Sequence, residues 1–211
     1  MDPVEYSLYL SEDNPMAEKP LELSRAFDAI VTLAKTAGVR IVLVGGLARN
    51  AYVRPRMTND IDFLVRDQEG LDRLATAAAD GFQVPKDVEA LAALRHRATG
   101  VEVDLMVAEY PFEWEGFDAA TTHRVRRKSV LVMPIEHLCA MKVDAAGSPS
   151  RFHDFGDVAQ MLAQGGANAE AVAALVRRDL PNRVPTLEAI LRVVGRSRTD
   201  PPTSAKGRGK R

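Results

Sequence analysis

A short apolar segment of the sequence, residues 60–65, begins with two carboxylates and reads Asp-Ile-Asp-Phe-Leu-Val. Successive side chains of a β-strand point to opposite faces, so Asp60 and Asp62 would share one face and Ile61 and Phe63 the other. Two like charges on one face of an apolar strand repel each other, and burying them is costly unless a cation lies between them. The segment therefore predicts a strand that binds a metal ion or, alternatively, a strand end at which both acids face water.

A third carboxylate, Asp104, lies within a second apolar segment, residues 101–107. An unpaired carboxylate is disfavoured in such a strand. If this strand lies beside that of Asp60 and Asp62, the three carboxylates converge and could hold two Mg²⁺ ions. Such a pair of ions stabilises both the attacking and the leaving oxygen of a phosphoryl displacement. The alternative for Asp104 is an ordinary ion pair with a nearby arginine.

Two glycines, Gly45 and Gly46, separate a β-branched apolar run at residues 41–44 from the start of a short helix. Glycine lets the backbone approach a ligand closely, and the N-terminus of a helix favours anions. The spacing matches neither the dinucleotide fingerprint nor the phosphate-binding loop with Gly-Lys-Ser/Thr. The pair therefore predicts a close approach to a phosphate or, alternatively, only a tight turn.

Apolar periodicity predicts a mixed α/β (α+β) chain in four parts. Residues 1–20 should be irregular, 21–133 should form an α/β domain, 134–195 a helical region, and 196–211 a disordered tail with six basic residues and one acid. Strands are expected at 41–44, 61–65, 94–98, 101–107, 122–126 and 129–133. Helices are expected at 21–37, 47–53, 70–79, 134–146, 150–164, 168–178 and 185–195.

The composition limits the classes of protein to which the chain can belong. It has 211 residues and a net charge of −1, and it contains no apolar run near the ~20 residues that a membrane helix needs. Its first twenty residues are acidic and lack the apolar core of a signal peptide. Cys139 is the only cysteine. A reducing compartment, the cytoplasm, is therefore expected, with no membrane partner.

Lys142 lies on the apolar side of the predicted helix at 134–146, which also carries Ile135, Leu138 and Cys139. A cation directed towards the core needs a partner, which a bound triphosphate would supply. The alternative is a lysine whose alkyl chain passes its apolar neighbours and brings the ammonium group to water.

Together, the apolar strand, Gly45-Gly46, thirteen intervening residues, Asp60-Ile61-Asp62 and the later Asp104 resemble the nucleotidyltransferase superfamily, which has the DNA polymerase beta-like fold. The resemblance covers about residues 39–107, and Arg56-x-Thr58-x-Asp60 is similar to the form found in small bacterial members. It implies a small mixed sheet flanked by helices, with a helical C-terminal region. It also implies that Asp60, Asp62 and Asp104 bind two Mg²⁺ ions.

The second half of the chain resembles the AbiEii/AbiGii toxin-type nucleotidyltransferases, which include the MenT toxins. The resemblance rests on Lys142-Val-Asp-Ala145, Arg151, Asp154 and Asp157, with His153 where a basic residue is usual. It implies that Lys142 contacts nucleotide phosphates and that Asp157 supports the site. The nucleotide-binding residues expected from both halves are Gly45, Gly46, Arg56, Thr58, Lys142 and Asp157.

The function implied is metal-dependent transfer of a nucleoside monophosphate from a nucleoside triphosphate, such as ATP, to an acceptor hydroxyl, with release of pyrophosphate. Asp104 would complete the metal site on the acceptor side and take the proton. The acceptor could be tRNA or another RNA, as in a toxin–antitoxin system with a cognate antitoxin. The alternatives are an antibiotic-type enzyme acting on a small molecule, or a non-catalytic binding module. The complete set of three acids favours an enzyme.

Overall fold

The structure is a computed structural model that describes residues 18–85, 90–125, 128–148 and 151–199. Seven strands form one mixed sheet in this part of the chain, in the order β3-β4-β5-β2-β1-β7-β6. Their bounds are β1 Ile41–Leu43, β2 Asp60–Val65, β3 Phe82–Gln83, β4 Leu91–His96, β5 Glu102–Val107, β6 Thr121–Val125 and β7 Lys128–Val132. The mixed α/β class expected from the sequence is confirmed.

The pairing of the strands places two of them side by side in parallel at the centre of the sheet. β2 pairs with β5 in parallel and with β1 antiparallel, and β1 pairs with β7 in parallel. β4 lies antiparallel to β5, β3 to β4, and β6 to β7. The predicted hairpin at 94–107 is thus present as β4 and β5, although β4 begins three residues earlier, at Leu91.

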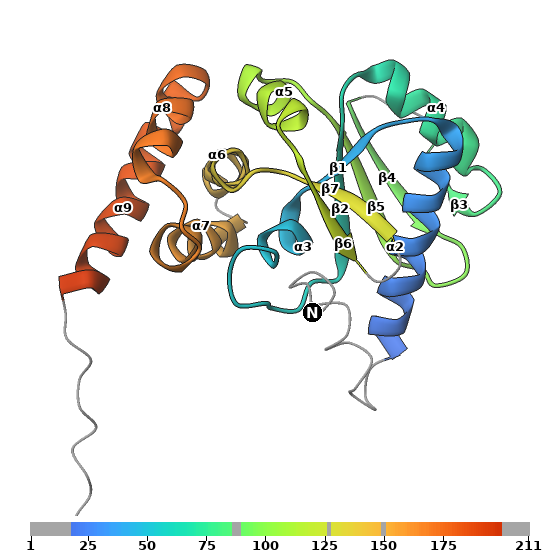
Figure 1. The fold of residues 1–211 in the computed structure, drawn as a ribbon, viewed down its shortest axis with the longest axis horizontal. Helices are drawn as coiled ribbons and strands as arrows, with labels where there is room; N and C mark the ends of the chain where they lie inside the picture. The colour runs from blue at the N-terminus through green and yellow to red at the C-terminus, as the bar shows by residue number, and fades with distance from the viewer. Residues whose placement is uncertain (1–17, 86–89, 126–127, 149–150, 200–211) are drawn as a thin grey trace, which may run out of the picture.

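The helices divide between the sheet and a C-terminal group (Figure 1). Their bounds are α2 Glu18–Ala37, α3 Gly45–Arg49, α4 Gln68–Ala78, α5 Pro111–Asp118, α6 Ile135–Ala146, α7 Phe152–Gln164, α8 Ala169–Asp179 and α9 Val184–Thr199, with a short 3₁₀ turn at Pro181–Arg183. α2 and α4 pack against each other and against β2, while α3 packs against both β2 and α6. The short helix α3 therefore connects the sheet to the C-terminal helices.

Several predicted boundaries were wrong. α2 begins at Glu18, inside the segment expected to be irregular, and α9 continues to Thr199, inside the segment expected to be a disordered tail. The short helix begins at Gly45 and ends at Arg49, earlier than the predicted 47–53. β3 and α5 were not predicted. Residues 1–17 and 200–211 lie outside the described residues, as do the predictions made for them.

One hydrophobic core extends from the sheet into the C-terminal helices. Its buried members include Phe27 of α2, Phe63 of β2, Leu138 of α6, Val158 of α7 and Ile190 of α9. No helix in the described part of the chain is both long enough and apolar enough to cross a membrane.

Candidate functional site

The carboxylates of β2 and β5 lie on the same face of the sheet. In the parallel register Asp62 lies opposite Asp104, and Asp60 lies opposite Glu102. The other face of β2 is apolar, because Phe63 is fully buried with its ring 6.1 Å from that of Phe27 in α2. The alternation that predicted a shared face for Asp60 and Asp62 is therefore present, and the second strand adds Asp104 beside them.

These carboxylates are electrostatically strained in the absence of a cation. Burial raises the pKa of Asp62 to about 6, and the negative charges of Asp60 and Asp104 add to the shift, against Lys142 and the Gly46 N–H. Burial and the charges of Asp60 and Glu102 likewise raise the pKa of Asp104, while Arg151 opposes them. A cation placed among the three acids would relieve this repulsion.

The chemistry of this donor set fits a hard divalent cation such as Mg²⁺, which prefers carboxylate oxygens. Within the described residues, however, no three His, Cys, Asp or Glu side chains already form a group that could hold a metal ion. Asp60 Oδ1 accepts a short hydrogen bond from the Thr58 hydroxyl. Asp104 forms no ion pair with any arginine of the described part of the chain, so the alternative interpretation of this residue is not supported.

The turn at Gly45 and Gly46 requires glycine because neighbouring side chains approach its backbone closely. Gly45 has φ +65°, and a Cβ atom added there would lie 1.8 Å from Asp62 Oδ2. A Cβ atom on Gly46 would lie 2.8 Å from Thr58 Oγ1. Any larger residue would therefore displace the side chains of Asp62 or Thr58. The two glycines thus allow these side chains to approach the backbone, which a tight turn alone would not require.

A polar cavity of about 240 Å³ opens at this end of β2. β2 contributes the acids Asp60 and Asp62, and other parts of the chain contribute both basic side chains and the acid Asp154. The lining residues are Gly45, Gly46, Arg56, Met57, Thr58, Asn59, Asp60, Asp62, Lys142, Arg151, His153 and Asp154. A lining with both acidic and basic side chains suits a ligand that carries both a metal ion and phosphate groups.

Lys142 lines this cavity, but its charge is matched within the protein. Its side chain is almost fully buried, and its Nζ lies 2.6 Å from Asp154 Oδ1 and 2.9 Å from Asp157 Oδ2. The sequence suggested either a triphosphate or water as the partner of this ammonium group. The structure instead provides two carboxylates from the next helix, α7.

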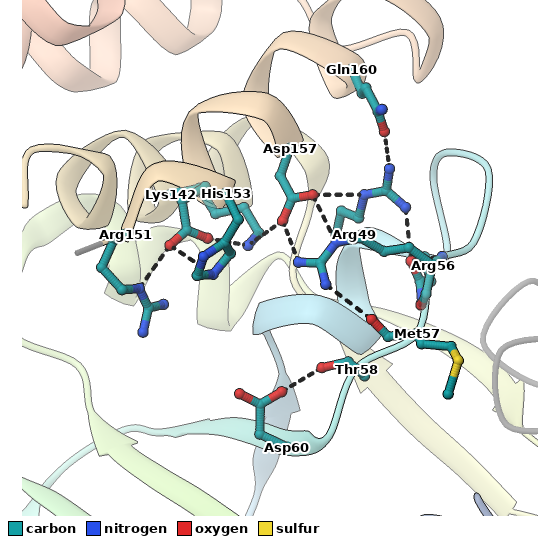
Figure 2. Close-up of polar contacts among 12 residues, drawn as sticks. Arg49, Arg56, Met57, Thr58, Asp60, Lys142, Arg151, His153, Asp157 and Gln160 are labelled. Atoms are coloured by element: carbon teal, nitrogen blue, oxygen red, sulfur yellow. Dashed lines mark hydrogen bonds and ion pairs between the residues drawn. The ribbon is translucent and has the colours of Figure 1, made fainter. Parts of the chain in front are cut away.

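Asp154 and Asp157 connect several cations around the cavity, as Figure 2 shows for Asp157. Asp154 is fully buried and also accepts a hydrogen bond of 2.8 Å from Arg151 Nε. Asp157 accepts two from Arg56, at 3.0 and 2.7 Å. Burial alone would raise the pKa of Asp157, but Arg56 and Lys142 lower it to about 2. Asp157 itself is absent from the cavity lining, so its position suits support of Arg56 and Lys142.

Sequence reasoning missed Arg49, the last residue of α3. Only 1% of its surface is exposed, and its guanidinium contacts Asp157 and Gln160 of α7 as well as the chain that follows α3 (Figure 2). Nothing in the sequence around Arg49 indicated burial, because an arginine after Gly-Gly-Leu-Ala is equally compatible with an exposed helix end.

A second cavity, of about 300 Å³, lies where β1 begins and β2 ends, away from the acidic face. Its arginines have structural partners at the ends of two helices. Arg73 donates to the carbonyl of Ala37, the last residue of α2, and Arg40 donates to the carbonyls of Phe117 and Asp118 at the end of α5. Cations at helix C-termini stabilise those ends. The smaller cavity beside the carboxylates is therefore the candidate site.

Two solved structures of one protein, at low sequence identity, share this fold. A solution structure of the antibiotic-resistance factor ANT(2'')-Ia has a TM-score of 0.54 and 16% identity and covers 79% of this chain and 95% of its own. A crystal structure of ANT(2'')-Ia with adenylyl-2''-tobramycin has a TM-score of 0.52 and 15% identity and covers 78% of this chain and 97% of its own. An antigenic nucleotidyltransferase-like protein from Paracoccidioides brasiliensis has a TM-score of 0.48 and 20% identity, with 80% and 93% covered.

A comparison with curated proteins finds no match to this sequence. A family model does match, over residues 32–201, and it is described as the nucleotidyl transferase AbiEii toxin of a type IV toxin–antitoxin system. The match includes the Gly45-Gly46 turn, the acids of β2 and β5, and the cations and acids of α6 and α7. The chain therefore belongs to the AbiEii family and is a nucleotidyltransferase.

Proposed function

We propose that the protein transfers a nucleoside monophosphate from a nucleoside triphosphate to an acceptor hydroxyl, in a reaction that depends on Mg²⁺ and releases pyrophosphate. The observation that carries this proposal is the register pair Asp62–Asp104, with Asp60 on the same face and basic side chains in the cavity lining. Acids on this strand face, together with the cations Arg56, Lys142 and Arg151 of the cavity lining, form a charge pattern that a metal-bound triphosphate would complement.

In this proposal Asp60 and Asp62, which line the cavity, hold two Mg²⁺ ions together with Asp104, which lies opposite Asp62 in the sheet but is not one of the lining residues. When bound, the ions would neutralise phosphate charge and lower the pKa of the acceptor hydroxyl. Asp104 is the carboxylate contributed by the neighbouring strand, and in this proposal it completes the metal site on the acceptor side and takes the hydroxyl proton on a carboxylate oxygen.

The triphosphate would lie against the basic side chains of the cavity lining. Arg56 and Arg151 retain exposed side-chain surface, 37% and 54%, so their remaining N–H groups can reach phosphate oxygens. Lys142 is nearly buried, lines the same cavity as Gly45 and Gly46, and would add positive charge from behind the two arginines. Thr58 would hold Asp60 through its hydroxyl.

We further propose that the acceptor is an RNA, with tRNA as the first candidate, and that a cognate antitoxin exists. The support is the family description, which is that of a toxin in a toxin–antitoxin system. Cys139, the only cysteine, is buried as a free thiol, which is consistent with our placing the reaction in the reducing cytoplasm. A small-molecule acceptor remains the second candidate, since the ANT(2'')-Ia complex contains adenylyl-tobramycin on a related fold.

The test is incubation of the protein with Mg²⁺ and each of the four nucleoside triphosphates, labelled at the α-phosphate, together with total RNA or an aminoglycoside mixture. Transfer of label to RNA, lost in Asp62→Asn, is the expected result. Label on the aminoglycosides would favour the second candidate. If the folded protein neither transfers label nor binds a nucleotide, the result would favour a non-catalytic binding module.

A further inference from the structure

Arg49 is the largest fully buried side chain of the described residues. A buried guanidinium is unfavourable unless its donors are paired. Burial lowers the pKa of Arg49, and the charge of Asp157 opposes this shift. Arg49 is also absent from the residues that line the cavity, so it has no surface with which to touch a substrate. The buried guanidinium is therefore placed to hold other groups of the protein rather than a substrate.

The guanidinium connects two parts of the structure that are far apart in sequence. On one side it meets α7, where Nε lies 3.3 Å from Asp157 Oδ1 and a terminal nitrogen donates to Gln160 Oε1. On the other side it meets residues 50–59, the loop from α3 to β2, where the second terminal nitrogen donates to the Arg54 carbonyl at 2.5 Å and to Asn50 Oδ1 at 2.9 Å. Figure 2 shows Arg49 and Arg56 both reaching the Asp157 carboxylate, and Arg49 also reaching Gln160.

Asn50, which Arg49 contacts, in turn holds the backbone of Arg56 by two hydrogen bonds. Asn50 is fully buried, and its Nδ2 donates to the Arg56 carbonyl at 2.8 Å while its Oδ1 accepts from the Arg56 N–H at 3.1 Å. Both polar groups of the Arg56 backbone are therefore held. The Arg56 side chain then reaches the same Asp157 carboxylate that Arg49 contacts.

We propose that Arg49 is a positioning residue that fixes the loop at 50–59 to α7 and thereby sets the placement of Arg56, Thr58 and Asp60 in the cavity. The role rests on the proposed function, in which Arg56 binds the triphosphate, Asp60 binds metal and Thr58 holds Asp60. Arginine suits the task because its planar fork of five donors can address acceptors on two sides at once. The single ammonium of a lysine would keep its charge near Asp157 but could not reach both α7 and the loop.

The deciding variant is Arg49→Lys. Its matched control is Arg183→Lys, the same change at a half-exposed arginine that pairs with Asp144 outside the cavity. Two measurements are made on each full-length protein. One is hydrogen exchange of the amides of residues 56–60 in the nucleotide-free protein, and the other is the dissociation constant for each Mg²⁺–nucleoside triphosphate. Melting temperatures are recorded alongside.

We expect Arg49→Lys to speed exchange of the loop amides about tenfold and to weaken nucleotide binding by a similar factor, because hydrogen bonds from a charged donor are lost. The control should change neither. Unchanged loop exchange in Arg49→Lys, or equal changes in the control, would overturn the proposal. If wild-type protein binds no nucleotide, the proposed function fails, while the exchange result still decides the role of Arg49. If Arg49→Lys does not fold, Asn50→Ala tests the same constraint by removing both contacts to the Arg56 backbone.

Discussion

At the scale of single residues, Gly45 is the glycine of the described residues at which an added side chain would meet a neighbour most closely, and that neighbour is Asp62. Gly45→Ala would place a Cβ atom 1.8 Å from Asp62 Oδ2, at a backbone φ of +65°. We expect the Asp62 carboxylate to move out of the acidic face and the fold to lose about 1–3 kcal/mol through backbone strain. Nucleotidyl transfer, measured with α-labelled triphosphate, should fall by at least two orders of magnitude, as is common when a reacting group is misplaced.

A suitable control for this change is Gly156→Ala in α7. Gly156 has no positive φ, and a Cβ atom there would meet nothing within 4 Å. Alanine is about 1 kcal/mol more favourable than glycine inside a helix, so this variant should be as stable as the wild type or more so, with unchanged transfer. A Gly45→Ala protein that retained full activity would show that the position of Asp62 is unimportant for the reaction.

Asp62→Asn tests the electrostatic strain directly. Because the pKa of Asp62 is raised from 3.8 to about 6 in the folded protein, the folded state binds more protons than the unfolded state between these values. The contribution of the Asp62 carboxyl to the free energy of unfolding therefore falls as the pH rises from about 4 to 6, and it stays unfavourable above that range. With EDTA present at pH 7.5, Asp62→Asn should be more stable than the wild type by about 1–3 kcal/mol.

Urea unfolding of both proteins from pH 4 to pH 8 measures this difference. The gap should close towards pH 4, where the wild-type carboxyl is protonated. A variant that is strongly destabilised at every pH would identify Asp62 as a structural hydrogen-bond partner, and the metal assignment would then fail.

Residues of the site differ in how far the sequence could predict them. The shared face of Asp60 and Asp62 follows from strand alternation alone, and the place of Asp104 follows once the two strands are neighbours. The partners of Lys142 and the burial of Arg49 do not follow in this way. They depend on how α3, α6 and α7 pack together, which is a tertiary property that periodicity within one helix cannot report.

At the scale of elements, the long amphipathic helices and apolar strands were predicted, whereas α5 and β3 were missed. α5 has only eight residues, several of them aromatic, and an internal glycine, Gly116, so its helix propensity is weak. It is stabilised instead by Glu113, whose carboxylate accepts from the N–H groups of Glu109 and Tyr110. β3 has two residues, which is too short for alternation to be recognised.

The ion pairs that Asp157 of α7 forms with the rest of the site give a prediction at the scale of elements. Asp157→Ala would leave Arg49, Arg56 and Lys142 without the carboxylate that all three approach. Removing one partner of a buried ion pair costs about 3–5 kcal/mol, because the remaining charges stay buried. Denaturation in urea should show a loss of this size. The control Asp144→Ala, which breaks a half-exposed pair with Arg183, should cost less than about 1 kcal/mol.

The Asp157 carboxylate should also determine how the free energy of unfolding changes at acid pH. The pKa of Asp157 is lowered from 3.8 to about 2 in the folded protein, so its stabilising contribution is complete above pH 4 and disappears as the pH falls towards 2. Wild-type stability should therefore drop more steeply over this interval than that of Asp157→Ala. Parallel acid limbs for the two proteins would show that the network contributes nothing to folding.

At the scale of the whole molecule, the sheet and the C-terminal helices share one continuous core, from Phe63 in β2 to Ile190 in α9. The cavity lies across the same boundary, since β2 supplies Asp60 and Asp62 while α6 supplies Lys142 and α7 supplies Asp154. The α/β part and the helical region distinguished in the sequence should therefore unfold together, in one cooperative transition.

Ligand binding tests whether the two parts of the chain unfold in one cooperative transition. A ligand that binds only the folded state stabilises it by about 2.7 kcal/mol at a concentration of 100 times its dissociation constant. For a chain of this length, each kcal/mol raises the melting temperature by about 2–4 °C, so Mg²⁺ with the preferred nucleoside triphosphate should raise it by roughly 5–10 °C. Because the ligand would contact both β2 and α7, the whole transition should move as a single peak in calorimetry. Asp62→Asn, which lacks one metal-binding charge, should show a much smaller shift. Two separate peaks, of which only one responds to the ligand, would mean that the helical region folds independently and that the nucleotide is bound by one part of the chain alone.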